Sequence, residues 1–149
     1  MKLSLVVPCY NEEDNVEKFY DEVKKSFLGK IENYEIIFVN DGSKDKTMKK
    51  LKEIYHNRQD TVVKVIGFSR NFGKEAAIYA GIKQAKGEYT TIIDADLQQR
   101  PEVVLEMVKV LDENADYDCV AAFQEKRSEG KVLTFFKNVF YSNSFFLVV

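Results

Sequence analysis

Short runs of apolar, β-branched residues alternate along this chain with longer segments in which apolar residues recur at helical spacing. The short runs are typical of buried strands and the longer segments of amphipathic helices. The predicted strands cover residues 3–7, 34–39, 62–68, 89–93 and 117–123, and the predicted helices cover residues 12–28, 47–57, 73–85 and 101–113. This alternation predicts an α/β fold with a mainly parallel sheet and helices on both faces.

The size and charge of the chain limit its class. At 149 residues, 45% of them hydrophobic and 31% charged, the chain can bury the core of a soluble globular domain. Its net charge of −2 argues against a dedicated nucleic-acid-binding protein. Cys9 and Cys119 lie in or beside apolar runs without metal-ligand spacing, which favours two buried free thiols in a cytoplasmic protein over a disulfide.

We expect neither a secretory signal nor a membrane span in this sequence. Pro8 interrupts the first apolar run, which is too short for the core of a signal peptide. No stretch reaches the roughly 18 uninterrupted apolar residues of a membrane span. The chain stops on apolar residues 147–149, so we expect a truncated C-terminus: an α/β domain over residues 1–123, then an aromatic helical segment over residues 124–149.

The aromatic segment allows two interpretations. Lys131 and Lys137 stand beside Phe135, Phe136 and Phe140, as in a helix that lies at a membrane surface. Alternatively, these aromatic side chains pack against a remainder of the domain that lies beyond the sequence. If they are exposed, they favour self-association into a homo-oligomer.

Two carboxylates one residue apart follow the fourth predicted strand. Asp94 and Asp96 come directly after it, and Pro101 suits the first turn of the next helix. Ligands of open α/β sheets bind at the carboxyl ends of strands, where two carboxylates can hold Mg²⁺ or Mn²⁺ and through it a diphosphate. About one Asp-x-Asp pair is expected by chance in such a chain, and we interpret a second pair, at residues 116–118, as a solvated loop.

The loops after the first two strands carry candidate nucleotide contacts. Tyr10 offers a ring on which a base could stack, and Glu12 could accept hydrogen bonds from a base or ribose. Acidic residues that favour a helix N-terminus are the alternative for this loop. Asp41 ends the second strand, where its carboxylate can pair with a base or ribose, whereas Ser43 or Asp45 can cap the next helix.

The loop after the third strand is basic. Arg70 and Lys74 flank Gly73 just before a predicted helix, which suits a diphosphate, although a solvated basic loop is equally consistent. The loop lacks the frame of a Walker motif, and no Gly-x-Gly-x-x-Gly follows the first strand. His56 is the only histidine and is expected in solvent, so a zinc site and a Ser-His-Asp triad are both disfavoured.

Together these segments resemble the N-terminal, nucleotide-sugar-binding part of an inverting family 2 glycosyltransferase with the Rossmann-like GT-A fold. The matching segments are Val6-Val-Pro-Cys-Tyr-Asn-Glu12, Val39-Asn-Asp-Gly-Ser-Lys-Asp-Lys-Thr47, Arg70-Asn-Phe-Gly-Lys74 and Asp94-Ala-Asp-Leu-Gln98. The last two are most similar to the polyprenyl-phosphate branch, which includes the dolichol-phosphate mannose synthases. The family usually has Asp or His and then Pro-Pro where residues 99–101 stand here, and its acceptor-site motifs would lie beyond Val149.

The resemblance implies a transfer of a hexose, with inversion, from a UDP- or GDP-linked donor to a polyprenyl phosphate at the cytoplasmic face of a membrane. It implies Asp94 and Asp96 as catalytic residues that, with Gln98, hold Mg²⁺ or Mn²⁺. The acceptor phosphate would meet Lys126 or Arg127. The residues it implies for nucleotide binding are Pro8, Tyr10, Asn11, Glu12, Asp41, Arg70, Lys74 and Asp94.

Two alternatives remain. The chain could bind a nucleotide without turnover, because the acceptor half of such an enzyme is missing from this sequence. It could also be a haloacid-dehalogenase-like phosphatase, in which the first Asp of an Asp-x-Asp pair is the nucleophile. That class would place the pair after the first strand, whereas here it follows the fourth.

Overall fold

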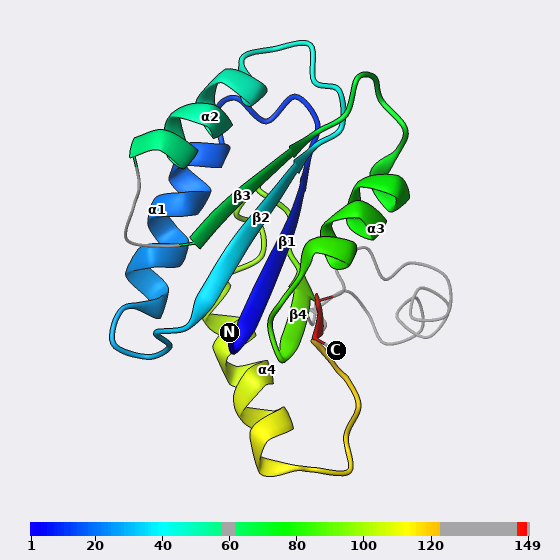
Figure 1. The fold of residues 1–149 in the computed structure, drawn as a ribbon. Helices are drawn as coiled ribbons and strands as arrows, with labels where there is room; N and C mark the ends of the chain where they lie inside the picture. The colour runs from blue at the N-terminus through cyan, green and yellow to red at the C-terminus, as the bar shows by residue number, and fades with distance from the viewer. Residues whose placement is uncertain (58–61, 123–145, 149) are drawn as a thin grey trace, which may run out of the picture.

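The computed structural model describes residues 1–57, 62–122 and 146–148. In this part of the chain the strands form one six-stranded sheet in the order β3-β2-β1-β4-β6-β5 (Figure 1). The strands are β1 (Leu3–Cys9), β2 (Tyr34–Asn40), β3 (Val62–Gly67), β4 (Tyr89–Ile92), β5 (Val120–Ala122) and β6 (Phe146–Val148). The helices are α1 (Val16–Phe27), α2 (Thr47–Asn57), α3 (Lys74–Gln84) and α4 (Pro101–Glu113).

The sheet is mainly parallel. Strands β1 to β4 run parallel to one another, whereas β6 pairs antiparallel with both β4 and β5. Helices α1, α2 and α4 cover one face, and α3 covers the other (Figure 1). The predicted α/β architecture with helices on both faces is therefore confirmed.

Alternate residues of β1 enter two hydrophobic clusters, because successive side chains of a strand point to opposite faces. Leu3, Leu5 and Val7 are fully buried in the larger cluster with α1, α2 and α4. Val6 belongs to the smaller cluster beneath α3. Helix α3 approaches the sheet closely because Gly81 lacks a side chain, and a Cβ at that position would overlap Val6.

The helices follow the spacing of their apolar residues. Helix α4 begins at Pro101, as predicted, and buries Val104, Met107 and Leu111 on one side. It is 13 residues long. Within the described residues, no helix combines the length and the apolar composition that a bilayer crossing requires.

A buried carboxylate ties the amino ends of three strands to the turn before β4. The Glu35 side chain is fully buried, and its Oε1 accepts hydrogen bonds of 2.7 Å from both Ser4 Oγ and the Lys86 N–H. Lys64 Nζ lies 2.6 Å from Glu35 Oε2 and donates to the Gln84 carbonyl at 2.7 Å. Desolvation alone would raise the pKa of Glu35, but the hydrogen bonds from Lys64, Ser4 and Lys86 outweigh it, and the pKa lies below its usual value.

The first strand ends later than the sequence predicts. It continues through Pro8, which pairs with Val39, to Cys9. The Cys9 carbonyl accepts the Asp41 N–H on the β2 side, so the neighbouring Pro8 turns its nitrogen toward β4. The ladder with β4 has already stopped there, so a proline without an N–H costs no sheet hydrogen bond.

The predictions for the last part of the chain need correction. The fifth strand is shorter than predicted and covers only Val120–Ala122. Residues 146–148 form a strand, not a helix, because they fill the sheet between β4 and β5, where Val148 pairs with both Thr91 and Val120. Residues 123–145 lie outside the described residues, so the expected aromatic helix there and the domain division at residue 123 stay predictions.

The two cysteines differ in exposure. Both are free, and Cys9 is buried as predicted, but Cys119 is exposed. The prediction for Cys119 is wrong because this residue lies in the turn before β5 and not within the apolar strand itself.

Candidate active site

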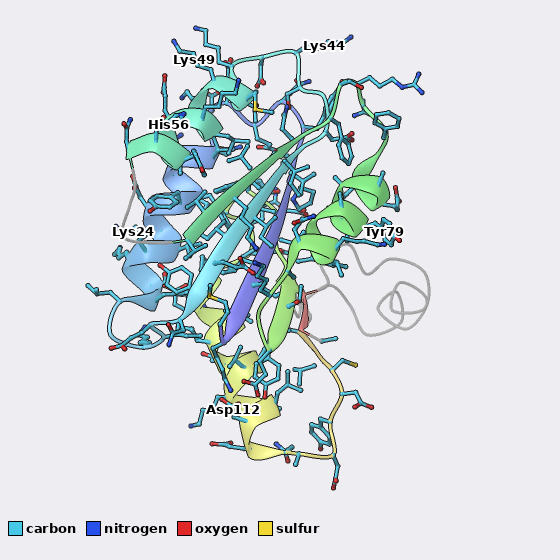
Figure 2. All side chains as sticks on the ribbon, in the orientation of Figure 1. Lys24, Lys44, Lys49, His56, Tyr79 and Asp112 are labelled. Atoms are coloured by element: carbon cyan, nitrogen blue, oxygen red, sulfur yellow. The ribbon has the colours of Figure 1, made fainter. Side chains whose placement is uncertain are left out.

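The four loops singled out above lie at the carboxyl edge of the parallel strands. They cover residues 10–15, 41–46, 68–73 and 93–100, after β1, β2, β3 and β4. Lys44 of the second loop lies at this end of the molecule, and Asp112 lies at the opposite end (Figure 2). Strands β2 and β3 lie on one side of β1, and β4 lies on the other. The loops after β1 and β4 therefore flank a topological switch point, the usual ligand site of an open α/β sheet.

Hydrogen bonds hold the first loop, after β1, against the second loop, after β2. The Asn11 N–H donates to Ser43 Oγ at 3.0 Å, and Asn11 Oδ1 accepts from the Lys44 N–H at 2.9 Å. The Glu12 N–H donates to Thr47 Oγ1 at 2.8 Å. Ser43 therefore holds the first loop, and of the two predicted caps, Ser43 and Asp45, it is Asp45 that caps the next helix. The sequence offers no signal for these hydrogen bonds, because their partners lie more than 30 residues apart.

Two acidic residues, Glu13 and Asp45, add further hydrogen bonds between the first and second loops. The Glu13 N–H donates to Asp45 Oδ2 at 3.1 Å, and Glu13 Oε2 accepts from the Lys46 N–H at 2.9 Å. Asp45 Oδ1 also accepts the Thr47 N–H at 2.9 Å, so Asp45 caps α2 as predicted. Desolvation would raise the pKa of Asp45, but hydrogen bonds from Thr47 and Glu13 outweigh it and lower this pKa.

Asp41 holds the third loop. Its carboxylate is only 3% exposed, and its Oδ1 and Oδ2 accept the N–H groups of Phe72 at 2.7 Å and Gly73 at 2.9 Å. Gly42, at φ 64°, lets the second and third loops touch, because a Cβ there would lie 2.5 Å from the Asn71 nitrogen. Each carboxylate oxygen keeps a further lone pair, so Asp41 remains a candidate nucleotide contact in addition to this positioning role.

Two non-glycine residues of the described part have a positive φ, and both lie in these loops. They are Asn11 at 56° and Leu97 at 59°. Asparagine tolerates this left-handed conformation, but for leucine it is an uncommon backbone state that the surrounding structure must enforce. Such strain clusters at functional sites, and it turns the chain sharply between Asp96 and Gln98.

The aspartate pair occupies this strained turn after β4. The Ile93 N–H still donates to the Val6 carbonyl at 3.0 Å, which anchors the turn to β1. Asp94 follows at once and is partly exposed, whereas Asp96 and Gln98 are exposed. Asp96 Oδ1 accepts the Gln98 N–H at 3.0 Å.

Lys74 connects the third loop to the aspartate pair. It is the first residue of α3, and its Nζ lies 2.7 Å from Asp94 Oδ1 and 2.8 Å from Asp94 Oδ2. Both side chains are partly exposed, 57% for Lys74 and 36% for Asp94. The sequence indicated both residues but not that they form an ion pair.

The remaining predicted nucleotide contacts differ in exposure. Tyr10 is 43% exposed and its ring is therefore accessible to a base. Arg70 is exposed, with its guanidinium carbon 4.8 Å from the ring centre of Phe72, an aromatic residue that the sequence analysis did not single out. Glu12 is half-buried, and its Oε2 accepts from Asn15 Nδ2 at 2.7 Å.

The aspartate turn suits a divalent cation. Its donors are hard oxygens, and Asp94 already chelates a cation, the Lys74 ammonium, between its two oxygens. Among the described residues no group of three or more His, Cys, Asp or Glu side chains is arranged so that it could hold a metal ion. A metal here would therefore rest on Asp94, Asp96 and Gln98 and would complete its coordination with ligand or water oxygens.

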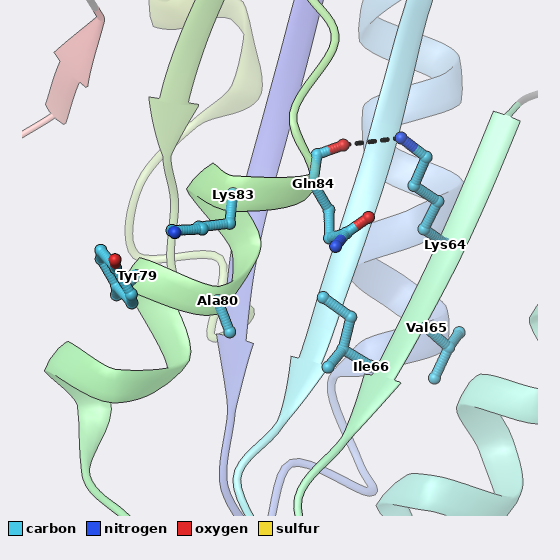
Figure 3. A pocket seen from close by; sticks show the side chains of 7 residues that line it. All are labelled: Lys64, Val65, Ile66, Tyr79, Ala80, Lys83 and Gln84. Carbon is cyan, nitrogen blue, oxygen red and sulfur yellow. Dashed lines mark hydrogen bonds between the residues drawn. The ribbon is translucent and has the colours of Figure 1, made fainter.

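A groove of about 460 Å³ between α3 and the edge strand β3 is lined by none of the residues in the four loops (Figure 3). Its lining residues are Lys64, Val65, Ile66, Tyr79, Ala80, Lys83 and Gln84. The predicted acceptor contacts Lys126 and Arg127 lie outside the described residues.

Comparison with known proteins identifies the family. The family model described as glycosyl transferase family 2 matches residues 4–145, which is nearly the whole chain. The chain belongs to this family. The resemblance inferred from the four loop segments is thereby confirmed.

Curated relatives of this family 2 chain are longer than it is. It is 46% identical over 137 residues to the uncharacterized glycosyltransferase YkcC of Bacillus subtilis, covering 92% of this chain and 40% of YkcC. It is 37% identical over 132 residues to the bactoprenol glucosyl transferase of Shigella phage SfV, covering 89% of this chain and 42% of that protein. The chain thus spans less than half the length of these relatives.

Solved structures support the GT-A fold of this family 2 chain. The mannosyltransferase PcManGT of Pyrobaculum calidifontis, solved in complex with GDP-Man and Mn²⁺, matches with a TM-score of 0.71 and 25% identity. The match covers 85% of this chain and 36% of PcManGT.

Proposed function

We propose that the protein transfers a hexose from a nucleoside-diphosphate sugar to a polyprenyl phosphate, with inversion and with a divalent metal. In this proposal the carboxyl edge of the sheet binds the donor. The relatives support the proposal, because one is a bactoprenol glucosyl transferase and a structural neighbour binds GDP-Man with Mn²⁺. Bactoprenol is a polyprenol, so the acceptor would be a lipid carrier at the cytoplasmic face of a membrane.

The observation that carries the proposal is the placement of Asp94 and Asp96 on one turn at the switch point, where the Asp94 carboxylate holds the ammonium of Lys74. A carboxylate that chelates an ammonium there, with Asp96 on the same turn, supplies the oxygen ligands that Mg²⁺ or Mn²⁺ requires. Asp94, Asp96 and Gln98 would hold the metal, and the bound metal would neutralise the charge that grows on the departing diphosphate.

The other loops would bind the nucleotide. Tyr10 would stack on the base, and Glu12 and Asp41 would accept hydrogen bonds from the base or ribose. Arg70 and Lys74 would lie beside the diphosphate, at the N-terminus of α3, where the helix dipole also favours an anion. Pro8 and Asn11 would shape the same site, since Asn11 is hydrogen-bonded to the loop that follows β2.

The acceptor proposed here needs little help from a base. A phosphate monoester has a second pKa of about 6, so its oxygen is already ionised near neutral pH. That oxygen would form a bond to the anomeric carbon from the face opposite the diphosphate, while the bond between this carbon and the diphosphate oxygen breaks. Lys126 or Arg127 would hold the acceptor phosphate.

Calorimetric titration tests the donor site. UDP and GDP are titrated with and without Mn²⁺ into the protein and into its Asp94→Asn, Asp96→Asn and Asp116→Asn variants. Asp116 belongs to the other Asp-x-Asp pair and is the matched control. We expect one nucleotide to bind only with Mn²⁺, with binding lost in the first two variants and kept in the third. Binding that is equal in all four proteins, or absent from a folded protein, would contradict the proposal.

A further inference from the structure

Lys74 occupies the place in the site where a metal would bind Asp94. Its Nζ contacts both oxygens of Asp94, at 2.7 and 2.8 Å, and these are the oxygens that Asp94 would offer to a metal ion. An ammonium and a divalent cation repel each other, so Lys74 at these distances opposes a metal on the same carboxylate. A metal that takes both oxygens of Asp94 would have to displace Lys74.

The position of Lys74 on its helix makes this displacement favourable when a diphosphate is present. A cation in the first turn of a helix is opposed by the helix dipole, so Lys74 gains from an anionic partner. Its backbone is fixed, because Asp41 holds the N–H groups of Phe72 and Gly73 just before it. The side chain is more than half exposed and can turn about this fixed point.

We propose that Lys74 is a residue that couples metal binding to donor binding. Without a nucleotide its ammonium is paired with Asp94 and weakens metal binding. When the diphosphate arrives, Lys74 pairs with the phosphate oxygens, and both oxygens of Asp94 become available to the metal. This inference rests on the proposed function and adds to it the order in which the site accepts its two ligands.

The coupling has a measurable size. Removing the ammonium releases Asp94 from an ion pair of partly exposed groups, which is worth up to about 1 kcal/mol, or about five-fold in an affinity. Lys74→Met should therefore bind Mn²⁺ about five-fold more tightly than the unchanged protein when no nucleotide is present. Nucleotide should raise the Mn²⁺ affinity of Lys74→Met by a smaller factor than it raises that of the unchanged protein, because the variant has no ammonium for the nucleotide to draw away from Asp94. The coupling between the two ligands is reciprocal.

Electron paramagnetic resonance of free Mn²⁺ measures these affinities without any turnover. Mn²⁺ is titrated into the unchanged protein, Lys74→Met, Lys74→Arg and Lys83→Met, each with and without UDP or GDP. Lys83 is the matched control, since it lies on the same helix but lines the separate groove (Figure 3). Lys74→Arg keeps the cation and should behave like the unchanged protein, which separates loss of charge from loss of folding.

The results distinguish this inference from the function on which it rests. Tighter Mn²⁺ binding in Lys74→Met alone, with a reduced effect of nucleotide, supports the coupling role. Mn²⁺ affinities of Lys74→Met and Lys83→Met that agree within two-fold would overturn it, while a nucleotide that still tightens Mn²⁺ binding would leave the donor site intact. A nucleotide that changes Mn²⁺ binding in no protein would overturn both.

Discussion

Replacing the buried Glu35 tests whether the polar cluster at the amino ends of the strands stabilises this fold. In Glu35→Gln the amide oxygen can still accept from Ser4 and from the Lys86 N–H, but its NH₂ group faces the Lys64 ammonium. Breaking a buried ion pair costs about 3–5 kcal/mol. Lys64 is 26% exposed and keeps its hydrogen bond to Gln84, so we expect the low end, about 3 kcal/mol.

The change should be visible in thermal and urea unfolding at pH 7. For a domain of this size, about 3 kcal/mol corresponds to a decrease in Tm of roughly 6–12 °C. The control is Glu17→Gln, which removes a partly exposed ion pair of 3.2 Å with Lys50 and should cost at most about 1 kcal/mol. A loss of stability in Glu35→Gln no larger than in Glu17→Gln would refute the reasoning.

The pH dependence of stability gives a second, independent readout of the same residue. The pKa of Glu35 is lowered in the folded state, so its contribution is complete above the unfolded value, about 4.3. The contribution is lost as the pH falls through the lower folded value. Between pH 7 and pH 3 the unchanged protein should therefore lose more stability than Glu35→Gln. Parallel pH profiles for the two proteins would show that the carboxylate is not preferentially charged when buried.

Two further predictions concern the loops and the cysteines. Gly42→Ala should disrupt the contact between the second and third loops, because Gly42 has a φ of 64° and the new Cβ would collide with the backbone of Asn71. We expect the free energy of unfolding in urea to fall by more than about 1 kcal/mol, and nucleotide binding measured by calorimetry to weaken. Cys119 should react with a thiol reagent within minutes at pH 8, whereas Cys9 should react only on unfolding. Burial, followed by the charges of Glu12 and Asp94, raises the pKa of the Cys9 thiol. Equal reaction rates for the two thiols would contradict this prediction.

The sequence predicts the elements of this fold well because their signals are local. The apolar runs of β1 to β4 and the spacing of buried residues in α1 and α4 arise within each segment. The order of the strands is not a local property, so the switch point beside β1 could not be read from the sequence. The antiparallel strand β6 was missed for the same reason, since three apolar residues form a strand only where β4 and β5 leave a place for them.

The candidate site was predictable in its members but not in their contacts. Each loop residue drew attention by its chemistry and by its position after a strand. Asp41 was expected to contact only a ligand, yet both of its oxygens hold the backbone of the third loop. Asn11 and Ser43 meet across 32 residues of sequence, and no periodicity marks such a pair.

These contacts connect each of the four loops to the next, and the connections differ in strength. The first loop is held to the second, and the second to the third, by hydrogen bonds in which a backbone N–H is the donor. Several of these hydrogen bonds are partly buried. The third loop meets the aspartate turn through the ion pair of Lys74 and Asp94, two partly exposed side chains. Exposed ion pairs contribute at most about 1 kcal/mol. A ligand can therefore rearrange this last contact at small cost while the other three loops keep their positions, which is the behaviour that the proposed coupling through Lys74 requires.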